Sequence, residues 1–151
     1  MTKKSKQSLP KKQRTRATFQ QADPSNSLHP IWSFDNIDTN GDFAFDLTRD
    51  DLNTDFILGK LISYSSMTWQ EILRQTHDNG KSKNHELNLD RLSQKAVERI
   101  KKKHLNIDVD SLFSFALDNI KRLIGIRKDA TFQVIWYDAN HEFCPSPKKH
   151  T

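Results

Sequence analysis

The sequence predicts an α+β fold with an N-terminal hairpin, two or three helices and a C-terminal three-stranded antiparallel meander. Three observations support this prediction. Short apolar runs with strand-like alternation follow one another over residues 112–138. Stretches before them carry apolar residues at helical spacing. Near the N-terminus, an Asn-Gly pair separates two apolar runs. A chain of 151 residues is long enough for one such domain with a single core.

The first 28 residues are expected to form a disordered basic arm, because they are rich in Lys, Gln, Ser, Thr and Pro and poor in large apolar residues. Residues 1–16 carry seven Lys and Arg and no acid, whereas the whole chain has a formal charge of +5, so the remainder sums to −2. Such an arm can contact several phosphates, and its candidate nucleic-acid contacts are Lys11, Lys12, Arg14 and Arg16. The alternative is a solubilising leader.

The folded domain is expected over residues 29–145, followed by a basic tail over residues 146–151. Its first element is the hairpin, residues 31–47, with Asn40-Gly41 at the turn. A calcium loop is the competing interpretation of this segment. It is disfavoured because Leu47 stands where the bidentate Glu is required.

Helices are expected next, over residues 50–63, 69–76 and 92–103. A Thr68–Glu71 capping box precedes the second helix. The third ends in a run of cations, which suits the helix dipole. An extended segment with a His at its start is expected over residues 85–89, after a polar loop.

The meander follows, and alternation sorts its side chains into two faces. The face expected to pack against the helices contains Phe113, Phe115, Leu117, Ile120, Arg122, Ile124, Ile126, Phe132, Val134 and Trp136. The opposite face, expected to be open, contains Lys121, Leu123, Arg127, Gln133, Ile135 and Tyr137. A slip of one residue would exchange the faces, so Arg122 and Arg127 both remain candidates. The alternative is that another element covers the second face.

The order of elements, with IKRLIGIR followed by FQVIWYDANH, resembles the RelE/ParE-like toxin superfamily over about residues 85–145. The chain is also similar to small uncharacterised bacterial and mobile-element proteins with an RIWGI…WYDPNH pattern. The toxin superfamily includes ribosome-dependent mRNA interferases and relatives that act on other targets. It does not require the predicted hairpin.

The resemblance implies cleavage of RNA with the neighbouring 2′-OH as nucleophile, at a basic face of the sheet. That reaction needs a general acid, a general base and cations that stabilise the phosphorane charge. His141 is the candidate acid or base, and Tyr137 would stack on or orient a base. Arg122 or Arg127, assisted by Lys121, would stabilise charge, and His85 is a second histidine candidate.

Other chemistry is disfavoured. The six His and one Cys lack metal-ligand spacing, and no nucleotide-binding glycine motif is present, so no metal or cofactor is expected. No apolar run approaches 18 residues, so no membrane partner is expected, and a cytoplasmic location is the default. Two functions outside catalysis remain open. One is a non-catalytic nucleic-acid-binding protein, and the other is a protein-interaction module of a mobile element. The expected partners are RNA or the ribosome, and an antitoxin or another protein.

Overall fold

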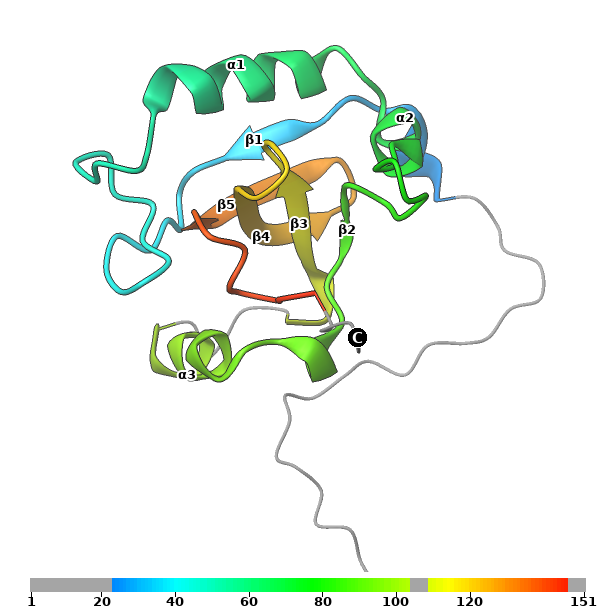
Figure 1. The fold of residues 1–151 in the computed structure, drawn as a ribbon. Helices are drawn as coiled ribbons and strands as arrows, with labels where there is room; N and C mark the ends of the chain where they lie inside the picture. The colour runs from blue at the N-terminus through cyan, green and yellow to red at the C-terminus, as the bar shows by residue number, and fades with distance from the viewer. Residues whose placement is uncertain (1–22, 104–108, 147–151) are drawn as a thin grey trace, which may run out of the picture.

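The computed structural model describes residues 23–103 and 109–146, and it shows an α+β architecture (Figure 1). The α+β class is therefore confirmed. The helices of this described part are α1 (Thr54–Ser65), α2 (Trp69–Arg74) and α3 (Gln94–Lys103), with short 3-10 turns at Pro24–Ser27, Leu89–Arg91 and Val109–Ser111. The strands are β1 (Ile31–Ser33), β2 (His85–Glu86), β3 (Leu112–Ala116), β4 (Arg122–Lys128) and β5 (Thr131–Asp138).

The strands form one mixed sheet of five strands in the order β1-β5-β4-β3-β2. The three C-terminal strands pair with one another antiparallel and in chain order. β2 adds antiparallel at one edge, and β1 pairs parallel with β5 at the other. The parallel pair needs a long connection, and α1 and α2 lie within it.

The predicted hairpin over residues 31–47 is wrong. Only Ile31–Ser33 is a strand, and its partner is β5. The segment from Phe43 to Phe45 is buried but forms no strand. Gly41 does adopt a positive φ of 90°, but it does so in a loop held by the buried carboxylate of Asp38. The Asn-Gly pair thus marks a turn without making a hairpin.

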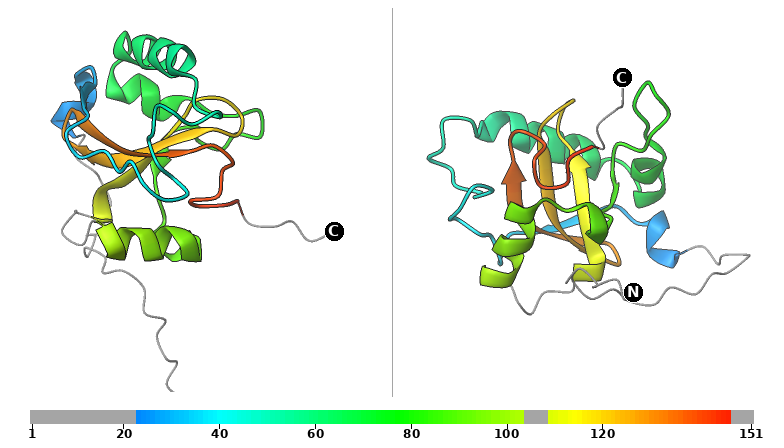
Figure 2. Two further views of the ribbon diagram at one scale, coloured as in Figure 1. Left: turned by 90° about the vertical axis from the view of Figure 1, so that its left-hand side faces the viewer. Right: turned by 60° about the horizontal axis from the view of Figure 1, so that its bottom comes forward.

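Helices cover both faces of the sheet (Figure 2, left). One core lies under α1 and α2 and includes Trp69, Phe115 and Phe132. The other lies under α3 and includes Ile100 and Trp136. The expected open face is therefore wrong. Its apolar members are buried within these two cores, Leu123 and Tyr137 in the first and Ile135 in the second.

The register explains why the predicted faces are mixed. Leu123 lies opposite Phe115, so it shares a face with that residue, while Ile124 turns toward α3. A bulge then interrupts the pairing of β4 with β5, which leaves Ile135 as the extra residue and moves Trp136 to the α3 face. Gly125 is required at this point, because a Cβ there would lie 2.0 Å from the carbonyl oxygen of Gln133.

The helix starts follow the sequence signals. The side chain of Asn53 accepts from the backbone N–H of Phe56 and caps α1. The predicted capping box of α2 is present: Thr68 accepts from the N–H of Glu71, and the Glu71 carboxylate accepts from the N–H of Thr68. The C-terminal half of α1 and Gln75, which follows α2, lie beside the β3–β4 turn, where the cavities are.

Candidate functional site

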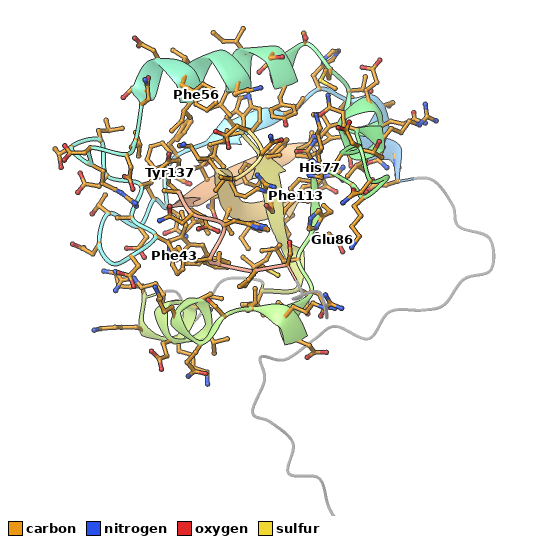
Figure 3. All side chains as sticks on the ribbon, viewed as in Figure 1. Phe43, Phe56, His77, Glu86, Phe113 and Tyr137 are labelled. Carbon is orange, nitrogen blue, oxygen red and sulfur yellow. The ribbon has the colours of Figure 1, made fainter. Side chains whose placement is uncertain are left out.

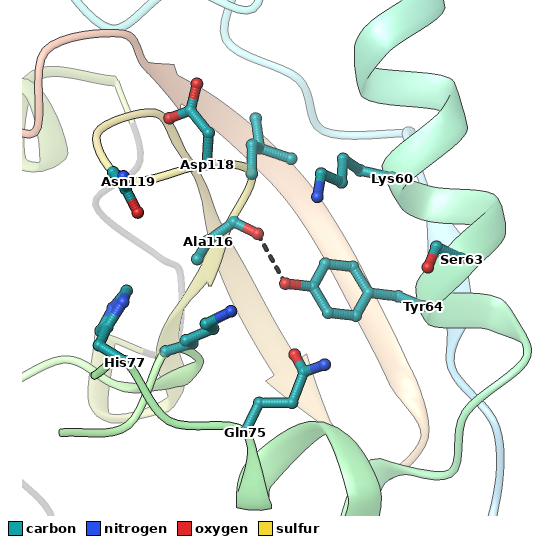
Figure 4. Close-up of a pocket in the computed structure, with 10 residues that line it drawn as sticks. Lys60, Ser63, Tyr64, Gln75, His77, Ala116, Asp118 and Asn119 are labelled. Atoms are coloured by element: carbon teal, nitrogen blue, oxygen red, sulfur yellow. Dashed lines mark hydrogen bonds between the residues drawn. The ribbon is translucent and has the colours of Figure 1, made fainter. Parts of the chain in front are cut away.

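Two cavities adjoin the turn between β3 and β4. The first, here called the histidine cavity, has a volume of about 500 Å³ and is lined by Thr76, His77, Asp78, Asn79, Lys83, Asn119, Arg122, His141 and Ser146. The second, here called the α1 cavity, has a volume of about 300 Å³ and is lined by Lys60, Ser63, Tyr64, Gln75, His77, Lys83, Ala116, Leu117, Asp118 and Asn119 (Figure 4). His77, Lys83 and Asn119 belong to both, so the cavities are neighbours.

His77 stands on the loop between α2 and β2. Its N–H donates to the carbonyl oxygen of Lys81 at 2.8 Å, and its own carbonyl oxygen accepts from Gly80 at 2.9 Å. Gly80 has a φ of 85°, which favours glycine. An isolated bridge between Thr76 and Ser82 closes the loop. The Asp-Asn-Gly turn therefore holds His77 at the border of the two cavities. The sequence predicts a polar loop here, and nothing in its pattern identifies His77 as a candidate.

His141 reaches the histidine cavity from the turn that follows β5. Its φ of 57° lies in the left-handed region, which is costly for a residue with a Cβ. The buried carboxylate of Asp138 holds the turn by accepting from the N–H groups of Glu142 and Phe143 at 2.9 and 2.8 Å. Phe143 is fully buried and anchors the same turn under α3. A strained residue fixed at the wall of a cavity is a reason to suspect function.

Arg122 is a buried cation in the wall of the histidine cavity, with 6% of its surface exposed. Its guanidinium donates to the carbonyl oxygens of Asp118 at 2.7 Å and Lys121 at 2.9 Å, and less closely to that of Asn119. Within residues 23–103 and 109–146 it makes no ion pair with a carboxylate. Burial lowers its pKa, although Asp118 and Asp138 partly oppose this.

Both cavity histidines have a lowered pKa. For His77 the causes are burial, then the positive charges of Arg122 and Lys83. For His141 the causes are burial and then Arg122, opposed by Asp138. The imidazoles are therefore mostly neutral at neutral pH and can accept a proton, and a bound anion would make them easier to protonate.

Two of the predicted catalytic residues lie away from this site. Tyr137 is buried in the core, donates its hydroxyl to the carbonyl oxygen of Asp51 at 2.6 Å, and has a pKa raised to about 12 chiefly by burial. Figure 3 shows it on the opposite side of the view from His77. The guanidinium of Arg127 stacks on Trp69 with 4.1 Å between its carbon and the ring centre.

Arg127 also binds the start of the described chain. Its guanidinium donates hydrogen bonds to the side chains of Ser25 and Asn26 at 3.1 and 2.7 Å. Residues 23–28 belong to the predicted arm, but they pack against the end of β4. Burial lowers the pKa of Arg127. Its guanidinium is occupied by contacts with Trp69, Ser25 and Asn26, which are structural.

The remaining predicted residues lie near the site or outside it. Lys121 pairs with Asp118 at 3.6 Å in the β3–β4 turn, and His85 is exposed on β2, where a ring nitrogen lies 2.9 Å from the carbonyl oxygen of Glu86. Neither lines the two cavities. The four predicted contacts of the arm lie outside the residues that the structure describes: Lys11, Lys12, Arg14 and Arg16.

In the described segments, no cluster of three or more His, Cys, Asp or Glu side chains is arranged to hold a metal ion. None of the helices in those segments has the length and apolar character needed to cross a membrane. Comparisons with protein-family models, curated proteins and solved structures gave no significant match.

Proposed function

We propose that the protein is a toxin-type RNA-binding protein that cleaves RNA in the histidine cavity. The observation that carries this proposal is the position of Arg122, a buried cation that makes no ion pair within the described chain, beside His77 and His141. A buried charge is costly unless it is paired. The planar guanidinium matches phosphate oxygens in geometry, and a phosphodiester would be such a partner.

The proposed reaction needs only groups of this chain and of RNA. One cavity imidazole takes the proton of the 2′-OH, and that oxygen attacks the adjacent phosphorus. The other imidazole, in its protonated form, gives a proton to the departing 5′-oxygen. Arg122 stabilises the charge of the phosphorane. The products are a 2′,3′-cyclic phosphate and a 5′-hydroxyl. Each positioned acid or base contributes about 10²- to 10⁴-fold to such a step.

The order of elements is consistent with the proposal. The resemblance to RelE/ParE-like toxins rests partly on the order of a strand or hairpin, two or three helices and an antiparallel meander. The chain has β1, then three helices with the short strand β2 between α2 and α3, and then β3, β4 and β5. The proposed site differs from the sequence-based expectation, because both sheet faces are covered and the cavities lie at the β3–β4 turn.

The test is cleavage of RNA by the purified full-length protein, with and without ribosomes. His77→Ala and His141→Asn should each lower the rate about 100-fold or more. Asn is chosen at position 141 because it tolerates the left-handed conformation. His29→Ala is the matched control, since His29 is exposed and bonds to the carbonyl oxygen of Ser65 away from the cavities. Its rate should stay at the wild-type level.

Equal loss in all three variants, or none in the two cavity variants, would remove the catalytic proposal. A second function has support from the same cation: RNA binding without cleavage. If the wild-type protein leaves RNA intact in both assays but binds it in a manner that Arg122→Gln abolishes, the protein is a non-catalytic RNA-binding protein. The folded state of Arg122→Gln must first be checked by circular dichroism, because the side chain holds the β3–β4 turn.

A further inference from the structure

The α1 cavity lies beside the proposed phosphate site. Lys60, Ser63 and Tyr64 project into it from successive turns of α1. Figure 4 shows these residues on one side of the opening, His77 and Asn119 on the other, and Gln75 below. Because His77, Lys83 and Asn119 also line the histidine cavity, the two cavities adjoin.

The floor of the α1 cavity is already satisfied in its hydrogen bonds. The hydroxyl of Tyr64 donates to the carbonyl oxygen of Ala116 at 2.6 Å and lies 3.1 Å from the side-chain oxygen of Asn84. Both oxygens of Asp118 are engaged, by the N–H groups of the turn and by Lys121. These contacts hold the floor in place. The groups that can contact a ligand are therefore those at the rim.

The rim, in contrast, offers polar groups without a hydrogen bond to any residue of the described chain. These are the amide of Asn119 and the hydroxyl of Ser63. The amide nitrogen of Gln75 has only a weak contact, at 4.0 Å to the sulfur of Met67, while its oxygen accepts from Asn84. Lys60 adds a cation, 5.9 Å from the ring centre of Phe56.

We propose that the α1 cavity is a nucleobase subsite, which takes the base next to the phosphate held at Arg122. The proposal rests on the proposed function, since it requires a phosphate in the histidine cavity. Side-chain amides offer a donor and an acceptor together, which is what the edge of a base requires. Sequence-specific proteins read single-stranded RNA in this way, through bases that are splayed out of the strand. The volume of about 300 Å³ is sufficient for a base.

The experiment compares ribose 5-phosphate, which has no base, with the four ribonucleoside 5′-monophosphates by isothermal titration calorimetry on the full chain. At least one nucleotide should bind about tenfold more tightly than ribose 5-phosphate, the gain expected for a well-placed base contact. Asn119→Ala should reduce this ratio at least fivefold, about the smallest effect of one bidentate contact.

A steric variant gives a second, independent test. Ser63→Leu places a larger side chain at the rim, and Ser63 is exposed on α1 with no side-chain bond in the described chain, so the fold should tolerate it. It should lower nucleotide affinity to the level of ribose 5-phosphate and leave ribose 5-phosphate unchanged. Thr54→Leu, at the exposed first position of the same helix and outside both cavities, is the matched control and should change neither.

The outcomes separate the two proposals. If ribose 5-phosphate binds and all four nucleotides bind no better, the base subsite is wrong and the phosphate site stands. The same conclusion follows if Ser63→Leu leaves nucleotide affinity unchanged. If ribose 5-phosphate and the nucleotides all fail to bind, the phosphate site and the base subsite are both overturned.

Discussion

Tyr137 is the residue whose place in the fold differs most from the role that its sequence context suggests. It points into the core under α1, and its hydroxyl donates to the carbonyl oxygen of Asp51 at 2.6 Å. Tyr137→Phe should therefore lower the free energy of unfolding by about 1 kcal/mol, the value of one such bond, and leave RNA cleavage unchanged. Urea denaturation and the cleavage assay measure the two effects. A stable variant that has lost cleavage would favour a site at the sheet face.

The two cavity histidines predict a pH dependence of stability. Their pKa values are lowered in the folded protein from an ordinary value of 6.5. The unfolded chain thus binds more protons than the folded one below about pH 6.5, and the contribution of these residues to stability is lost as the pH falls through that region. Above it, their contribution is fully present. Thermal or urea unfolding between pH 5 and 8 checks this expectation.

Substitution assigns that pH dependence to residues. His77→Asn and His141→Asn should each flatten the decline of stability below pH 6.5, because the lowered pKa is removed with the imidazole. His29→Asn, at an exposed site away from the cavities, should leave the slope as it is in the wild type. An unchanged slope in both cavity variants would mean that other groups cause the acid sensitivity.

At the scale of the elements, one buried carboxylate joins α3 to the sheet. Asp38 has 2% of its surface exposed, and it accepts two bonds from Arg99 on α3, at 2.7 and 2.9 Å, and one from the indole of Trp136 on β5, at 2.8 Å. These bonds lower its pKa despite burial. Asp38→Asn would leave the guanidinium without its counter-charge. We expect a loss of about 3 kcal/mol in the free energy of unfolding.

The control for that prediction is Asp42→Asn, in the same loop. Asp42 meets Lys95 at 3.7 Å, and both side chains are more than half exposed, so solvent screens the pair. The change in unfolding free energy should be within about 0.5 kcal/mol, which urea denaturation resolves from the larger loss. A loss of similar size in both variants would contradict the assigned role of Asp38.

The sequence predicts those elements that are determined by local signals. The capping box at Thr68 and Glu71, the cationic end of α3 and the apolar runs of β3, β4 and β5 are all local features. The face of the sheet to which each side chain points is not determined by local sequence. The bulge at Ile135 moves Trp136 to the other face, and only the pairing of β4 with β5 reveals it. The parallel pairing of β1 with β5 is likewise a long-range contact that alternation cannot predict.

The candidate site shows the same division. His141 and Arg122 are identified from the sequence because they stand in or beside strands with an unusual basic pattern. His77 is missed because it lies in a polar loop, and only the packing of that loop beside the β3–β4 turn brings it to the same cavity. Conversely, Tyr137 and Arg127 are residue types that suit the predicted site, but their side chains make structural contacts. Tyr137 donates to the carbonyl oxygen of Asp51, and Arg127 stacks on Trp69.

For the whole molecule, the covered sheet limits where the proposed RNA substrate could contact the folded part. With α1 and α2 on one face and α3 on the other, the proposed chemistry is placed in the cavities at the β3–β4 turn. The positive charge, in contrast, is concentrated at the N-terminus: residues 1–16 carry +7, and the rest of the chain sums to −2. Long-range attraction to RNA should therefore come mainly from the arm, and the chemistry from the histidine cavity.

Deleting residues 1–20 tests this division. The truncated protein should bind long RNA more weakly and with a smaller dependence on salt, because each lost phosphate contact reduces the slope of log K against log salt by about 0.7, and seven contacts by about 5. Cleavage of a dinucleotide should keep its wild-type rate, since that substrate fills only the cavities. Replacing the four arm candidates by Gln, at Lys11, Lys12, Arg14 and Arg16, should give an intermediate slope. An unchanged slope after deletion would place the RNA contacts on the folded part and leave the arm as a solubilising leader.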